Sequence, residues 1–181
     1  LRTRIGCSAK TVSELKHPFD RTLVSIAAWE DPLEELPDLI AHPPGKSIDI
    51  SLDLVDDDDL NSAKMASAAL LTACLPGARL FTQPYLDLDR TMDVANGFLD
   101  GLCNPRPVTT VYRILNTVLF SRSESWSLSS TTPLSIRSDS RELTLRHTAE
   151  ALGRHLDLIS GTSHNSGADL DTPLSLREIL L

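Results

Sequence analysis

Repeated strand and helix patterns in the first ~120 residues constrain the fold of this chain more than any other feature. Residues 22–29 form a continuous apolar run, typical of a strand covered on both faces, whereas 47–54 alternates strictly between polar and apolar residues. Weaker strand patterns occupy 4–8 and 78–83. Strands that alternate with helices indicate parallel strands joined by helical crossovers. We therefore predict an α/β fold built on a parallel sheet.

Helix signals follow each of these strands. Asp31 is a suitable N-cap, and Pro32 sits at the first helical position, where its missing N–H costs nothing. Four consecutive aspartates, 56–59, precede another helix and complement the positive end of its dipole. The predicted helices cover 11–16, 32–40, 63–74 and 108–119.

The pattern changes after Phe120, where Ser and Thr become frequent and apolar residues recur with a period of two. The short strands predicted there cover 126–128, 134–136, 143–145 and 156–158. They fit a small antiparallel β-module, so we divide the chain into 1–121 and 122–181. Residues 161–167 are polar, and the tail 173–181 fits either a further strand or a helical turn.

Composition excludes several classes of protein. The chain has 25 acidic and 17 basic residues and a net charge of -8, which disfavours binding to a nucleic-acid backbone. Its apolar runs are far shorter than the roughly 18 residues that a membrane span needs, so we expect no membrane segment. Cys7, Cys74 and Cys103 form no C-x-x-C pair and fit reduced thiols better than a disulfide. No targeting pattern constrains the cellular location.

Motifs for cofactors and metals are also missing from the sequence. The chain contains neither of the glycine-rich phosphate motifs nor the G-x-S-x-G motif of serine hydrolases. Its five histidines lie apart without zinc-binding spacing, and the helix dipole explains the run 56–59 better than a cation does. We therefore predict no cofactor and no metal.

Paired carboxylates at strand ends are the remaining catalytic hypothesis. Hydrolysis of a glycosidic bond needs two of them, one as acid and one as nucleophile or base. The candidates are Asp49 and Asp53 on the polar face of the third strand, Asp87 and Asp89 after the fourth, and Glu30 and Asp31 after the second. Simpler alternatives stay open: Glu30 and Asp31 can cap a helix, 87–90 can form an ion pair within its loop, and the polar face can be solvated.

Trp29 stands at the end of the second strand in a chain with only 4% aromatic residues. An exposed indole there offers a flat apolar surface for a sugar ring, and a buried one packs against the edge of the sheet. The sequence leaves both interpretations open.

The segment 96–108, N-G-F-L-D-G-L-C-N-P-R-P-V, resembles the last loop and helix of TIM-barrel glycoside hydrolases, which often show "G-L-L-D … N-P-[RK]-P-A". By the same resemblance, 23–29, 45–52 and 80–83 look like their sixth, seventh and eighth strands, and the part from Trp126 like their small β-sandwich. The resemblance implies the second half of a (β/α)8 barrel. The first half, with the proton donor on the fourth strand, would then lie upstream of Leu1.

The chain departs from the pattern of that family at its catalytic positions. Leu52 stands where the family has its nucleophilic glutamate, Ala27 replaces a histidine, and Thr82 replaces a tryptophan. If the register shifts by one residue, Asp53 takes the place of the nucleophile. The resemblance therefore implies a retaining site that is either altered or lost.

The expected function is carbohydrate-related: a divergent glycosidase, or a degenerate barrel that binds a glycan without cleaving it. Asp53 and Asp49 are the predicted catalytic residues, and the predicted sugar-binding residues are Trp29, Gln83, Asp87 and Asp89. The alternative is a structural or interaction protein without a sugar ligand. An exposed Trp29 beside Asp49 and Asp53 in one cleft would favour the sugar.

Overall fold

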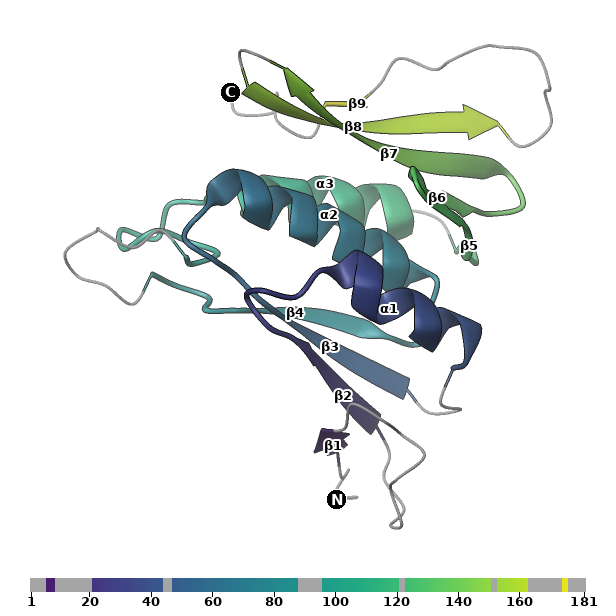
Figure 1. Cartoon of the computed structure of the whole chain (residues 1–181), viewed down its shortest axis with the longest axis horizontal. Coiled ribbons are helices and arrows are strands. Elements are labelled where there is room, and N and C mark those ends of the chain that lie inside the picture. The colour runs from purple at the N-terminus through teal and green to yellow at the C-terminus, as the bar shows by residue number, and fades with distance from the viewer. Residues whose placement is uncertain are drawn as a thin grey trace.

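The computed structural model describes residues 6–8, 21–43, 47–87, 96–120, 123–150, 153–162 and 174–175. These residues form three layers, in which a helical layer lies between a parallel sheet and an antiparallel sheet (Figure 1). The strands of the parallel sheet are β1 (Gly6–Ser8), β2 (Arg21–Ile26), β3 (Ser47–Asp53) and β4 (Arg79–Gln83). The helices are α1 (Pro32–Ala41), α2 (Asp58–Ala73) and α3 (Pro107–Phe120). The predicted helix over 11–16 lies outside the described residues.

The first sheet is parallel throughout, as predicted, with the order β1-β2-β3-β4. Leu23 pairs with Asp49, which in turn pairs with Arg79, so corresponding residues of the three long strands lie in rows across the sheet. The described strands form an open sheet and do not close into a barrel. What is established is thus a parallel α/β sheet with helical crossovers.

The two faces of this sheet differ in side-chain chemistry. Ile26, Ile50 and Leu52 point toward the helices and are completely buried. On the opposite face, Leu23 is 37% exposed and Phe81 50% exposed, because no described helix or strand covers them. The strict alternation of 47–54 therefore corresponds to one apolar face buried under helices and one open polar face.

The helices begin where the sequence provides caps. Asp31 accepts a hydrogen bond from the backbone N–H of Leu33, and Asp57 accepts one from Leu60. Helix α2 begins five residues earlier than predicted, because Asp57 caps it and Asp58 and Asp59 occupy its first turn. Since α2 lies between α1 and α3 and between the two sheets, it is buried nearly all round, and its alanines and serines allow this close packing.

The antiparallel sheet consists of β5 (Ser127–Thr131), β6 (Leu134–Arg137), β7 (Arg141–Glu150), β8 (Gly153–Thr162) and β9 (Leu174–Ser175), in that order. The resemblance implied a sandwich, but the described strands form one sheet whose apolar face packs on the helices. The hydrophobic core consequently continues from Ile50 through Leu70 of α2 to Leu143. Among the described residues, no helix has the length and apolar character needed to span a membrane.

Candidate functional site

The carboxyl ends of β2, β3 and β4 meet at one edge of the parallel sheet. Ile26 pairs with Leu52, and Asp53 pairs with Gln83, so the three strands end almost level. Trp29 follows three residues after the end of β2. The segments that carry Trp29, Asp53 and Gln83 therefore run side by side in the same direction, and we refer to these three residues as the rim.

Asp53 and Gln83 form a direct pair on the open face of the sheet. The side-chain amide of Gln83 donates a hydrogen bond to Asp53 Oδ1 at 2.7 Å. The pair is solvent-exposed, and each partner keeps an oxygen, Asp53 Oδ2 and Gln83 Oε1, that can accept a hydrogen bond from a ligand. The two predicted residues therefore form one polar unit.

Trp29 lies in a turn that is closed by hydrogen bonds. The N–H of Glu30 donates to the carbonyl of Ala27 at 3.0 Å, and the Glu30 carboxylate accepts from the N–H of Ala27 at 2.8 Å. Trp29 as a whole residue is 86% exposed. Of the two interpretations that the sequence left open, the exposed one is correct.

Lys64 of α2 supports the backbone of the rim from the helical side of the sheet. This residue was not identified from the sequence. Its side chain is only 4% exposed, and its ammonium group donates to the carbonyls of Ala28 at 2.9 Å, Ala27 at 3.1 Å and Asp53 at 3.3 Å. Burial lowers the pKa of Lys64. The available signal was that Lys64 is the only charged residue between Leu60 and Leu75.

Asp49 does not join the rim. It lies four residues before Asp53 on the same face of β3, which at about 3.3 Å per residue separates the two by about 13 Å. Its two oxygens accept hydrogen bonds from Arg21 Nε at 2.7 Å and from an Arg21 Nη at 2.5 Å. Hydrolysis requires carboxylates roughly 5 to 9.5 Å apart, so the structure does not bring Asp49 and Asp53 together as such a pair.

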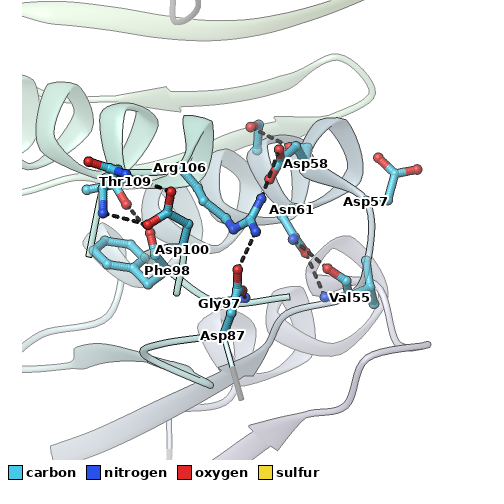
Figure 2. Close-up of polar contacts among 12 residues, drawn as sticks. Val55, Asp57, Asp58, Asn61, Asp87, Gly97, Phe98, Asp100, Arg106 and Thr109 are labelled. Carbon is cyan, nitrogen blue, oxygen red and sulfur yellow. Dashed lines mark hydrogen bonds and ion pairs between the residues drawn. The ribbon is translucent and has the colours of Figure 1, made fainter. Parts of the chain in front are cut away.

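Asp87 is committed to an ion-pair network on the other side of the carboxyl edge (Figure 2). Its side chain is 3% exposed and binds Arg106, which also faces Asp58 at 3.6 Å. The N–H of Gly97 donates to the same Asp87 carboxylate, and a Cβ at Gly97 would overlap the Asp87 backbone. Arg106 lies 19 residues from Asp87 in the sequence, and Arg90, the cation of the ion pair considered within 87–90, lies outside the described residues. Asp89 lies outside the described residues.

Asp58 and Arg106 each keep a polar atom without a partner in the described part of the chain. These atoms, Asp58 Oδ1 and Arg106 Nε, are buried. Burial raises the pKa of Asp58, while the charge of Arg106 lowers it by less. At Asp58, the cost of burying the charged carboxylate therefore exceeds the stabilisation from the charge of Arg106, and we call this imbalance electrostatic strain.

The segment that carries the family resemblance performs a structural role here. Asp100 accepts hydrogen bonds from the backbone of Leu102 and from both the backbone and the side chain of Asn104, which lowers the pKa of Asp100. The Thr109 hydroxyl donates to the carbonyl of Phe98, visible in Figure 2. These bonds fold the loop so that Arg106 reaches Asp87.

Leu52, at the position of the expected nucleophile, is completely buried against the helices. Its neighbour Asp53 points to the open face of the sheet. In a closed barrel, this face would correspond to the interior. The residue at the end of β3 that can reach a ligand is thus Asp53.

No group of three or more metal-binding side chains occurs within the described residues. Cys74 and Cys103 are free thiols, and burial raises the pKa of Cys74 to about 12, which makes it unreactive. The side chain of Cys7 lies outside the described part.

Comparisons with known proteins add no identity to this geometry: no family model, no curated protein and no solved structure matches the chain.

Proposed function

We propose that the rim binds a carbohydrate, with Trp29 as a stacking surface and the Asp53–Gln83 pair as the hydrogen-bonding group. The single observation that carries this proposal is the 86% exposure of Trp29 at the same sheet edge as that pair. An indole stacks on the apolar C–H face of a sugar ring, while a carboxylate and an amide bind its hydroxyl groups. Sites at the carboxyl ends of parallel strands are usual in α/β proteins.

The proposal extends to the architecture. The open face carries polar residues and half-exposed apolar ones, which fits the interior face of a glycosidase-like (β/α)8 barrel. In that arrangement, an upstream half-barrel supplies the other four strands and the proton donor. The resemblance of 96–108 supports this reading, and the burial of Leu52 beside an accessible Asp53 fits a divergent site.

Binding is favoured over hydrolysis for the residues in hand. Asp53 is the carboxylate that pairs with Gln83 at the rim, whereas Asp49 is neutralised by Arg21 and Asp87 by Arg106. The nearby Glu30 and Asp31 carboxylates accept backbone hydrogen bonds that close the turn and cap α1. Cleavage would require a second carboxylate close to Asp53. We therefore assign Asp53 a binding role, which becomes catalytic only if the barrel provides that partner.

The test measures binding of the chain to α- and β-linked hexasaccharides of glucose, xylose and mannose by titration calorimetry. Trp29→Ala should weaken the tightest interaction at least about tenfold, which corresponds to about 1.4 kcal/mol. The matched control is Trp126→Phe, because Trp126 is the only other tryptophan and is buried beside Arg141, away from the rim. Equal affinities for Trp29→Ala and the wild type would refute the role of Trp29.

A second candidate function is an interaction protein without a sugar ligand, and the face of the parallel sheet that no described element covers favours it. All-parallel sheets are normally covered on both faces, yet Leu23 and Phe81 remain exposed. The partner that fits is a protein surface with apolar side chains that covers this face in place of the half-barrel described above. This reading expects a hydrophobic dye to bind the chain and the double variant Leu23→Ser, Phe81→Ser to lose that binding, with no affinity for any hexasaccharide.

A further inference from the structure

The Lys64 ammonium group lies at a place where three backbone carbonyls converge, two from the turn after β2 and one from the end of β3. Ala27 and Ala28 lie in the turn after β2, and Asp53 is the last residue of β3. All three carbonyls are within 2.9 to 3.3 Å of the same nitrogen. Because an ammonium group has three N–H bonds, Lys64 can serve each carbonyl with one.

Burying this charge is costly unless it is hydrogen-bonded, so the site explains why a lysine is accommodated inside α2. The carbonyls compensate the ammonium group, and the carboxylates of Asp31, Asp53 and Glu30 add favourable charge at longer range. In turn, Lys64 satisfies carbonyl oxygens close to the end of the β-ladder. The arrangement links α2, β2 and β3 at a single atom.

The consequence for the rim follows from chain connectivity. The carbonyl of Ala28 belongs to the peptide unit that leads directly into Trp29, and the carbonyl of Asp53 belongs to the residue that binds Gln83. Besides the β2–β3 ladder and the hydrogen bonds between Glu30 and Ala27, one buried side chain therefore ties the backbone at the stacking surface to the backbone of the polar pair. The side chain of Trp29 is too exposed to be held by packing of its own.

We propose that Lys64 is the positioning residue of the rim: it fixes the backbone of Trp29 relative to Asp53, and glycan binding depends on it although it does not touch the ligand. This inference rests on the proposed carbohydrate function. Its physical basis is preorganisation, since a ligand that bridges two loosely connected groups must order them on binding and loses affinity.

The first variant is Lys64→Met, which retains a similar length of side chain and removes all three donors. Backbone 13C carbonyl chemical shifts report on the structural part without any ligand. The shifts of Ala27, Ala28 and Asp53 should change, because each carbonyl loses a hydrogen-bond donor. Affinity for the hexasaccharide that the wild type binds best should fall at least about tenfold.

The control for general destabilisation is Leu143→Ala, a completely buried residue of the antiparallel sheet on the far side of the helical layer. This variant should lose stability while preserving both the three carbonyl shifts and the affinity. If Lys64→Met does not fold, Lys64→Gln keeps two N–H donors and should show smaller changes of the same kind.

The outcomes are separable. Changed carbonyl shifts with unchanged affinity in Lys64→Met would overturn the positioning role and leave the carbohydrate proposal intact. Unchanged carbonyl shifts in Lys64→Met would have the same two consequences. Absence of glycan binding by the wild type would overturn the carbohydrate proposal and this inference with it. Loss of affinity in Leu143→Ala to the same extent would reduce the effect of Lys64 to stability alone and also refute the inference.

Discussion

The two sides of the carboxyl edge use charge in opposite ways. On the β2–β3 side, Lys64 binds only backbone carbonyls, which leaves the side chains of Trp29 and Asp53 at the surface. On the β4–α3 side, Asp87 and Arg106 bind each other. A cation that binds main-chain carbonyls supports a site and leaves its side chains available for a ligand. A cation that binds a carboxylate makes that carboxylate unavailable. The comparison distinguishes Asp53, which can bind a ligand, from Asp87, which holds loops together.

The largest effect should come from breaking the β4–α3 side. Arg106→Met leaves the Asp87 carboxylate, 3% exposed, buried without its cation. We expect the free energy of unfolding to fall by about 3 kcal/mol, the lower end of the range for a broken buried ion pair, because Arg106 itself is 17% exposed. Urea denaturation measures this change. Arg113→Met, an exposed arginine of α3, should change stability by less than about 0.5 kcal/mol.

A loss below 1 kcal/mol for Arg106→Met would contradict the structural assignment of Asp87. It would also return Asp87 to the set of carboxylates that can face a ligand, so the contrast between the two sides would disappear.

The next effect isolates the backbone of the same network. Gly97→Ala places a Cβ against the backbone N of Asp87 and the carbonyl of Leu99, and neither can move freely. We expect a loss of roughly 1 to 3 kcal/mol from this overpacking. Gly101→Ala provides a matched control, because a Cβ there meets no atom within 4 Å. Thermal and urea unfolding of the two variants should therefore diverge, and equal stability would refute the tight packing around Asp87.

Features of the two sides of the carboxyl edge could be predicted from the sequence only where the interacting residues are close in sequence or in strand register. The parallel strands, the Asp31 cap and the common edge of Trp29, Asp53 and Gln83 follow from local patterns together with the direction of parallel strands. These properties need only neighbours in sequence or in register. The rim could therefore be predicted before any coordinates.

The supporting contacts could not be predicted in the same way. Lys64 binds carbonyls 36 and 37 residues away, and Asp87 binds Arg106, 19 residues away. Such long-range contacts depend on the paths of the loops, which the hydrophobic periods of strands (two residues) and helices (3.6 residues) do not encode. The same limit explains the antiparallel module, where alternation predicted the strands but not that the described ones form one sheet on the helices.

On the rim side, a change of charge should affect binding far more than stability. Asp53→Asn keeps the shape and the capacity to pair with Gln83 but removes the negative charge from an exposed position. We expect stability to change by less than about 0.5 kcal/mol and hexasaccharide affinity to fall about tenfold. If the full protein hydrolyses a glycan, this variant should also abolish turnover. Asp38→Asn, an exposed aspartate of α1, is the control and should alter neither property.

Unchanged affinity and turnover in Asp53→Asn would remove Asp53 from the site. A stability loss comparable to that of Arg106→Met would instead show that both sides of the edge are structural, and the distinction drawn above would fail.

The smallest effect concerns pH and tests the electrostatic strain at Asp58. Burial raises the pKa of Asp58 above its ordinary 3.8, against the opposing charge of Arg106 and with repulsion from Asp87, Asp57 and Asp56. A carboxyl group with a raised pKa binds more protons in the folded chain than in the unfolded chain. It therefore stabilises the fold below its unfolded pKa, and this contribution is lost as the pH rises through the folded pKa.

Asp58→Asn lacks the titrating group, so its stability relative to the wild type should improve as the pH is raised from about 3 to about 6. Urea denaturation across this range, with Asp38→Asn as a reference, measures the trend. A relative loss of stability for Asp58→Asn over the same range would mean that Arg106 outweighs burial at Asp58, and the β4–α3 side would then be a balanced ion-pair network.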